Sequence, residues 1–219
     1  MRSKLLRALL LGMSIALCIA PLATAAQDEW QLAKKTRPGL TLPMVKLKCD
    51  MQRLWLEHGS WTHRYIVSAL AGLDDKDKVL ARLLRNQQDI GNAIKPYYGE
   101  EAGNKYASLL TEHIVLAGKI VDALKSGNQV DAEKINKDWH KNADDIARYL
   151  SGLNPNWSYQ DLKAIWDRHL ELITEQLKAR LAKDWEADIV AFDKGQDHLV
   201  KYANTLSTGI VKQFPNKFQ

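Results

Sequence analysis

The stretch L-E-H ending at His58 and the stretch T-E-H ending at His113 begin two copies of one pattern. In the first copy N-Q-Q-D-I-G-N-A-I starts at Asn86, 28 residues after its histidine; in the second, N-A-D-D-I-A-R-Y-L starts at Asn142, 29 residues after its histidine. A turn signal lies midway in each copy, G-L-D-D-K-D and K-S-G-N-Q respectively. Because a helix rises by about 1.5 Å per residue, motifs equally distant from a turn reach the same height on facing helices. We therefore expect two antiparallel helix pairs, each bringing Glu-His beside Asn-x-x-Asp.

Apolar residues recur at helical spacing along most of the chain, which predicts helices. The predicted helices cover residues 44–71, 75–95, 100–125, 130–150 and 158–213. Pro96 should end the second helix, because proline lacks the N–H that a helix needs. The last segment would be roughly 80 Å long as one helix, so we expect a bend at residues 183–186 that brings His169 opposite the region of His198. The predicted class is all-α, an up-down bundle of five or six helices with an internal pseudo-two-fold repeat of helix hairpins.

The start of the chain has the pattern of a targeting segment. Residues 1–26 combine a basic start, an apolar stretch and small residues at a cleavage site, which predicts a signal peptide. Residues 27–43 are expected to form an extended arm and residues 44–214 a single helical-bundle domain. No later segment is apolar enough for a transmembrane helix. We therefore expect an exported bacterial protein, periplasmic or extracellular.

Charge and cysteine content restrict the partners. The chain has 31 basic and 26 acidic residues, a net charge of +5; three of the basic residues and no acidic one lie in the leader, so the remainder carries +2. No basic cluster with interleaved aromatic residues occurs, so no nucleic acid partner is expected. Cys49 is the single cysteine after the leader. We expect a buried thiol there; the alternative is an intermolecular disulfide, which would make a homodimer.

Three histidines, His58, His113 and His169, fall within the apolar stripes of the predicted helices. A lone histidine on an apolar face is usually a core residue, but three at mid-helix positions favour a shared site. Burying an imidazole costs desolvation free energy unless the ring has a partner. A metal ion is one such partner. Hydrogen bonding to Asn86, Asn142 and nearby carboxylates is the other.

Glu57 and Glu112 complete the predicted metal ligands, each directly preceding its histidine. Adjacent helix residues point about 100° apart, so a Glu-His pair cannot chelate one ion from one place. This differs from the Glu-x-x-His spacing of ferritin-like dinuclear sites, where both side chains share a face. The alternative for the glutamates is a salt bridge on the helix flank, for instance with Arg53.

The predicted cofactor-binding residues are Asn86, Asn142, Asp89 and Asp145. An amide inside a helix is unfavourable unless it bonds across to another group, so we expect the asparagines to orient a histidine ring or to bind a ligand. The aspartates lie one turn further on and could hold an imidazole in one tautomer. For Asp145 a solvated helix face is the alternative.

The expected donors are imidazole, carboxylate and amide groups, which favour Zn, Cu, Fe or Mn over Ca. The sequence has no C-x-x-C-H motif for covalent haem, and no P-loop, G-x-G-x-x-G or G-x-S-x-G, so we expect no nucleotide cofactor and assign no reaction. The first hypothesis is a metal-binding protein. The alternatives are a non-catalytic protein that binds a small ligand in its polar core, and a secreted interaction protein whose polar interior only fixes helix register.

Several phrases of the sequence are characteristic as a set. They are L-W-L-E-H-G-S-W-T-H-R (54–64), L-L-R-N-Q-Q-D-I-G-N-A-I-K-P-Y-Y-G (83–99), L-L-T-E-H (109–113), N-A-D-D-I-A-R-Y-L (142–150), L-N-P-N-W (153–157) and G-I-V-K-Q-F-P (209–215). Together they resemble a family of small exported bacterial helical-bundle proteins of unassigned function, found in spore-formers and other bacteria. The likeness covers residues 50–215 and implies the same bundle and the same site positions. Some of these proteins are named glycosyltransferase, and the residues here do not support that name.

Overall fold

The computed structural model describes residues 39–219, which contain helices and no strand, so the all-α class is confirmed. The described helices are α2 (Leu42–Ala71), α3 (Lys76–Lys125), α4 (Gln129–Leu153), α5 (Tyr159–Ala182), α6 (Trp185–Gln213) and the short 3-10 helix η1 (Pro215–Phe218). The signal peptide predicted for residues 1–26 and most of the arm predicted for residues 27–43 lie outside the described residues.

Local capping explains where several helices begin and end. Thr41 caps α2 by accepting a hydrogen bond from the backbone N–H of Met44, so the helix starts at Leu42, inside the predicted arm. Ser158 caps α5 in the same way, as its position before a helical stripe indicates. Lys183 has a φ of 58°, in the left-handed region, which ends α5. The predicted bend at residues 183–186 is therefore confirmed, and α6 follows it as a separate helix.

Helix α3 differs from the prediction that Pro96 ends a helix. The helical backbone continues past Pro96, and the break comes at Gly99, with φ 87° and ψ 171°. The predicted turn at P-Y-Y-G is thus present, three residues after the expected end. Proline removes one hydrogen bond from a turn of helix that is already the last before the chain changes direction. Glycine can adopt the positive φ that the change of direction requires.

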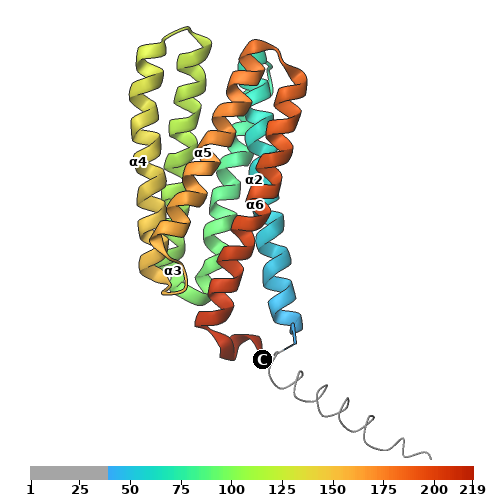
Figure 1. The fold of residues 1–219 in the computed structure, drawn as a ribbon, viewed down its shortest axis with the longest axis vertical. Coiled ribbons are helices and arrows are strands. Elements are labelled where there is room, and N and C mark those ends of the chain that lie inside the picture. The colour runs from blue at the N-terminus through green and yellow to red at the C-terminus, as the bar shows by residue number, and fades with distance from the viewer. Residues whose placement is uncertain (1–38) are drawn as a thin grey trace, which may run out of the picture. The chain divides into compact units, whose positions relative to one another are not determined.

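The helical segments alternate in direction and pack side by side (Figure 1). α2 packs against α3 and α6, and α4 packs against α3 and α5, while α5 and α6 also pack together. Large side chains fill the interior, among them Trp55, Trp139, Trp166 and Tyr106, each at most 2% exposed. The antiparallel pairs bring the first half of α3 onto α2 and its second half onto α4. The pseudo-two-fold relation between these pairs stays a prediction.

None of the helices within residues 39–219 has an apolar stretch long enough to span a bilayer.

Candidate functional site: a buried imidazole centre

The structure brings the three histidines of the predicted metal set to one place inside the bundle. His58 lies on α2, His113 on the second half of α3 and His169 on α5, and they are 1%, 2% and 6% exposed. The ring centroid of His169 lies 5.7 Å from that of His58 and 5.9 Å from that of His113. We call these three side chains the imidazole centre.

Asn142 on α4 fixes the orientation and the tautomer of His113. The amide nitrogen of Asn142 donates to the backbone carbonyl of Leu109 at 3.2 Å, so its Oδ1 is left to face the ring as an acceptor. His113 Nδ1 donates to this oxygen at 3.0 Å. The neutral ring therefore carries its proton on Nδ1 and presents a lone pair at Nε2. Within residues 39–219 this buried Nε2 has no hydrogen-bond partner.

Gln87 on α3, which was not among the predicted site residues, has the corresponding place beside His58. Its amide nitrogen donates to the carbonyl of Leu83 at 2.8 Å and lies 3.3 Å from His58 Nδ1. With Gln87 as donor, the neutral His58 ring carries its proton on Nε2, and this N–H has no partner in the part of the chain that the structure describes. The signal for Gln87 was its spacing, since it follows His58 by 29 residues, as Asn142 follows His113.

Asn86 joins α2 to α3 instead of contacting a histidine. Its amide nitrogen donates to the backbone carbonyl of Leu54 at 3.0 Å. Asn142 makes the same kind of bond in the second helix pair, to the carbonyl of Leu109. Asn142 thus both joins its two helices and orients a histidine. In the first pair, Asn86 joins the helices and Gln87 contacts the histidine.

Burial keeps the rings of the imidazole centre uncharged. Desolvation lowers the pKa of His58 to about 4, although the hydrogen bond from Gln87 acts in the opposite direction. Desolvation also lowers the pKa of His113 to about 3, against a smaller effect of Asn142. The pKa of His169 lies well below its usual value for the same reason, and the neighbouring imidazoles lower it further. Neutral imidazole is the form that binds a metal ion or a hydrogen-bonding ligand at neutral pH.

Aromatic side chains surround the imidazole centre. Trp139 stacks on His113, with ring centroids 5.1 Å apart and an angle of 28° between the planes. Trp166 meets His113 and His169 edge-on, at 5.0 and 5.5 Å. The indole N–H of Trp166 donates to the hydroxyl of Tyr202 at 3.2 Å, and so is satisfied. These rings separate the three histidines from solvent.

His198 on α6 lies beside His169, as the predicted bend implies. The two rings are nearly parallel, at an angle of 13°, with centroids 6.3 Å apart. Both histidines line one narrow space together with Trp55, Trp166 and Tyr202. It nowhere opens wide enough to admit a water molecule. The space beside His169 and His198 therefore has no room for an organic ligand as the side chains stand.

The predicted glutamate ligands lie outside the imidazole centre. Glu57 accepts hydrogen bonds from Arg53 at 2.7 Å and from Arg82 at 2.9 Å, which is the flank salt bridge considered as its alternative. Glu112 is exposed and accepts a longer bond, 3.3 Å, from the amide of Asn142. Neither carboxylate reaches the histidine rings, because each points away from the histidine that follows it.

The predicted aspartates also lie on the flanks of their helices. Asp89 lies 4.0 Å from Arg82, and Asp145 bonds to Lys141 at 2.6 Å. Across residues 39–219, no group of three or more His, Cys, Asp or Glu side chains is arranged to hold a metal ion as it stands. The donors at the centre are thus imidazoles alone, and their nitrogens do not yet converge.

A second buried polar cluster joins α2, α5 and α6. Asp188 is 2% exposed and accepts a hydrogen bond from Arg180 at 3.0 Å. His63 Nε2 donates to the same carboxylate, 3.1 Å from each oxygen, and its ring packs against Phe192. The carboxylate is fully paired, so this cluster fastens three helices together.

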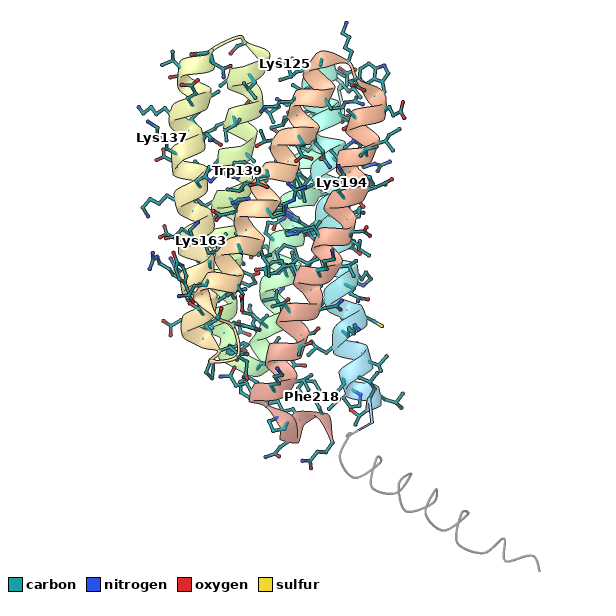
Figure 2. All side chains as sticks on the ribbon, in the orientation of Figure 1. Lys125, Lys137, Trp139, Lys163, Lys194 and Phe218 are labelled. Carbon is teal, nitrogen blue, oxygen red and sulfur yellow. The ribbon has the colours of Figure 1, made fainter. Side chains whose placement is uncertain are left out.

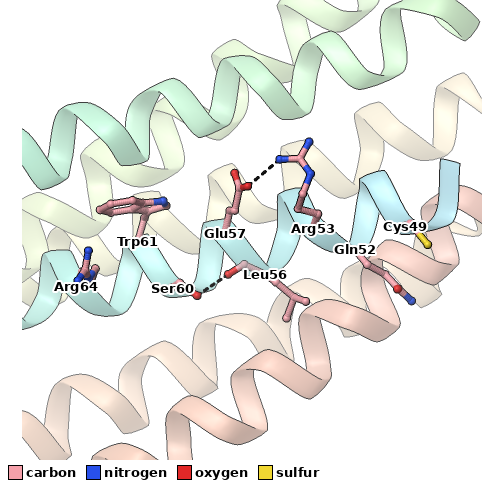
Figure 3. A pocket seen from close by; sticks show the side chains of 8 residues that line it. All are labelled: Cys49, Gln52, Arg53, Leu56, Glu57, Ser60, Trp61 and Arg64. Atoms are coloured by element: carbon pink, nitrogen blue, oxygen red, sulfur yellow. Dashed lines mark hydrogen bonds and ion pairs between the residues drawn. The ribbon is translucent and has the colours of Figure 1, made fainter. Parts of the chain in front are cut away.

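The outer face of α2 carries a shallow depression around Cys49 (Figure 3). It is lined by Cys49, Gln52, Arg53, Leu56, Glu57, Ser60, Trp61 and Arg64. All of these residues belong to one helix, so no second element closes the depression over a ligand. Cys49 is an exposed free thiol, and the prediction of a buried thiol is wrong because this position faces away from the helix's apolar stripe. The intermolecular disulfide and the homodimer stay predictions.

Unsatisfied polar atoms gather at the imidazole centre. In the described chain these include Nε2 of His58, His113 and His198 and the indole nitrogens of Trp55 and Trp139. A buried polar group without a partner costs about 1–3 kcal/mol. Such groups are rare in native proteins and often mark the position of a water or an ion. A concentration of them around three clustered imidazoles identifies this region as the candidate functional site.

The fold and the site define an all-α bundle protein with a histidine-rich interior. Comparison with known proteins gives no relative: no protein-family model, no curated protein and no solved structure matches this chain.

Proposed function

We propose that this protein is an exported helical-bundle protein that binds one transition metal ion at His58, His113 and His169. The observation that carries the proposal is the clustering of three buried, neutral imidazoles, two of which have no Nε2 partner among the described residues. A metal ion would satisfy these nitrogens at once. Gln87 and Asn142 would hydrogen-bond to the rings of His58 and His113 and hold these ligands in place.

Distances between the rings support an ion. With metal–nitrogen bonds of about 2.0–2.1 Å, the centroids of imidazoles around a tetrahedral ion lie about 5 Å apart. The two centroid distances of 5.7 and 5.9 Å exceed this by less than 1 Å. Binding therefore requires the three rings to move so that their nitrogens converge on one point. His58 would also move its proton to Nδ1, and Gln87 would turn its amide to accept it.

The size of the space and the type of donor atoms limit which ligand can bind. The space beside His169 and His198 admits no water molecule, so an ion is favoured over an organic molecule. Imidazole suits Zn, Cu, Fe and Ni, whereas Mn and Ca prefer oxygen donors. Since the carboxylates of Glu57 and Glu112 lie outside the centre, we favour Zn or Cu over Mn. No covalent haem, nucleotide or reaction is part of the proposal.

Metal analysis of the purified protein tests the proposal. The protein, loaded with Zn or Cu salts in separate samples and desalted, should retain about one ion per chain by elemental analysis. The variants H58Q, H113Q and H169Q should each retain clearly less. H140Q is the matched control, because His140 is exposed and lies outside the centre, and it should retain as much as the wild type.

Two results would overturn the metal proposal. One is a wild-type protein that keeps no ion; the other is retention that does not change in the triple variant H58Q/H113Q/H169Q. Circular dichroism must show that each variant is helical, so that a lost ion is not the result of unfolding. The imidazoles would then be packing residues that fix helix register.

The proposal that the protein is exported depends on the predicted signal peptide at residues 1–26, and it has its own test. We expect the mature protein, recovered from a bacterial host, to begin at Ala26 or Gln27, which follow the two small-residue cleavage patterns. Mass spectrometry of the exported protein measures this. Recovery of the protein with residues 1–26 still attached, inside the cell, would contradict export.

A further inference from the structure

A fourth histidine, His198 on α6, lies beside the imidazole centre but is not one of the three ligands proposed above. Its ring is nearly parallel to that of His169, at an angle of 13°, with the ring centroids 6.3 Å apart. The centroids of His58 and His113 lie 5.7 and 5.9 Å from that of His169. His169 therefore has three imidazole neighbours at similar distances, and His198 is one of them.

This part of α6 lies at the level of the imidazole centre. Trp139 on α4, whose ring stacks on His113, and Lys194 on α6, one turn before His198, are at nearly the same height along the bundle (Figure 2). α6 also packs against α2 and α5, two of the helices that carry the imidazole centre. α6 therefore adds a fourth helix to those that meet there.

The ring of His198 is oriented as that of a metal ligand would be. The side chain is half-buried, but its Nε2 is fully buried and has no hydrogen-bond partner within residues 39–219. The backbone carbonyl of Ile165 accepts a hydrogen bond from the ring, so the donor is Nδ1 and the lone pair is on Nε2. Metal-binding histidines usually donate their second ring N–H to a carbonyl or a carboxylate in this way. His198 thus has the tautomer that Asn142 gives to His113, without the proton movement that His58 requires.

We propose that His198 is the fourth ligand of the metal ion, so that imidazoles from α2, α3, α5 and α6 close its coordination shell. This inference rests on the metal site proposed at the imidazole centre. In the part of the chain that the structure describes, His58, His113 and His198 each have a buried Nε2 without a partner, and one ion would satisfy all three. The four rings must move so that their nitrogens converge, as the three rings must without His198.

The number of ligands decides what the ion can do. Zinc sites with four protein ligands are closed and structural, whereas catalytic sites hold the ion by three protein ligands and keep the fourth position for water or substrate. With His198 bound, the ion would have no open position. The metal would then stabilise the bundle and would not activate a water molecule.

Cobalt(II) is the probe that tests the closed shell, because it replaces zinc and its visible absorption depends on the number and arrangement of the ligands. The wild-type protein, loaded with cobalt, should show the strong visible absorption of a tetrahedral ion. Azide is a small anion that binds to open metal positions. Millimolar azide should leave the spectrum of the wild-type cobalt protein unchanged.

The variant H198A removes the proposed fourth ligand. We expect it to bind cobalt about 100-fold more weakly or worse, since the loss of an outer partner of a ligand already costs about 10–100-fold. Its spectrum should change when azide is added, and free imidazole should restore the wild-type spectrum by filling the space of the lost side chain. H140A is the matched control, because His140 is exposed and lies outside the imidazole centre. It should have the affinity and the spectrum of the wild type and should not respond to imidazole.

Two results would overturn this inference and leave the three-ligand proposal standing. One is a wild-type cobalt protein whose spectrum changes with azide, which would show an open position. The other is an H198A variant, helical by circular dichroism, that binds cobalt with the affinity and the spectrum of the wild type. If H198A does not fold, the azide result for the wild type still decides. A wild-type protein that retains no cobalt, zinc or copper would overturn both proposals.

Discussion

Burial sets the protonation of His58 and His113, and with it the chemistry of the interior. Their pKa values, about 4 and about 3, are lowered chiefly by desolvation. An imidazole in the unfolded chain binds a proton below about pH 6.5. Between pH 6.5 and about pH 4 the unfolded state therefore binds more protons than the folded state, and the free energy of unfolding falls as the pH falls.

We predict a measurable loss of stability over this pH range. The shift of His58 alone corresponds to about 3 kcal/mol, which is fully present above pH 6.5 and is lost by about pH 4. Urea unfolding at pH 7 and at about pH 4.5 measures it. The H58Q/H113Q variant should lose much of the difference, whereas H140Q should keep it. A pH dependence that is the same in H58Q/H113Q as in the wild type would contradict the prediction.

Single residues also show what the sequence could and could not predict. The helical stripes correctly place His58, His113 and His169 inside, because a buried face follows from periodicity alone. The role of Gln87 was not predicted, because the two copies differ by one residue in register and Asn86 seemed the natural equivalent of Asn142. Which of two adjacent amides meets the ring depends on helix rotation, and the sequence pattern leaves that rotation open.

At the scale of the helices, the two halves of α3 approach each other closely across the break at Gly99. A Cβ on Gly91 would lie 2.5 Å from the backbone oxygen of Gly103 and 2.7 Å from the Cβ of Ala107. A Cβ on Gly103 would lie 2.7 Å from the backbone oxygen of Gly91. The two glycines therefore let the halves of α3 pack backbone to backbone.

We predict that G91A lowers the free energy of unfolding by about 1–3 kcal/mol, because backbone atoms must move to make room for the methyl group. The matched control is G152A on α4, where a Cβ would meet nothing within 4 Å. That change should be neutral or stabilise by up to about 1 kcal/mol, since alanine is the better helix former. Chemical unfolding of the two variants measures the contrast. Equal effects would show that the halves of α3 are not in close contact.

The cluster around Asp188 is expected to stabilise the packing of α2, α5 and α6. D188N removes the charge that pairs with Arg180 and His63, and breaking a buried pair costs about 3–5 kcal/mol. Because both partners are partly exposed to solvent, we expect the lower end of this range. D145N is the control, since its pair with Lys141 lies on the surface and is worth less than about 1 kcal/mol. Thermal unfolding of both variants measures the difference, and a D188N protein as stable as D145N would contradict the role of the cluster.

Helix ends were predictable where a cap decides them and not where packing does. The helix start at Ser158 was predicted from local chemistry. The bend at residues 183–186 was predicted from length, since one helix over residues 158–213 would be roughly 80 Å long. The predicted helix end at Pro96 is wrong, because proline can remain inside a helix when the lost hydrogen bond lies near a turn, and the break comes at Gly99.

For the whole molecule, the imidazole centre is where α2, α3 and α5 meet. An ion held by His58, His113 and His169 would join three helices that are distant in sequence. A ligand that binds only the folded state stabilises it by about 2.7 kcal/mol when its concentration is 100 times its dissociation constant. For a domain of this size that corresponds to a rise in Tm of roughly 5–10 °C. Metal binding at the imidazole centre would thus stabilise the entire bundle.

We predict that Zn raises the Tm at pH 7 and still raises it at about pH 5.5. Exposed histidines are mostly protonated at pH 5.5 and release metal, whereas the pKa values of His58 and His113, about 4 and about 3, keep these rings available. Calorimetry with and without Zn at the two pH values measures the shift. In the H58Q/H113Q/H169Q variant, any shift at pH 7 comes from exposed groups and should disappear at pH 5.5. A wild-type shift that disappears in the same way would place the ion on the surface instead of among the buried rings.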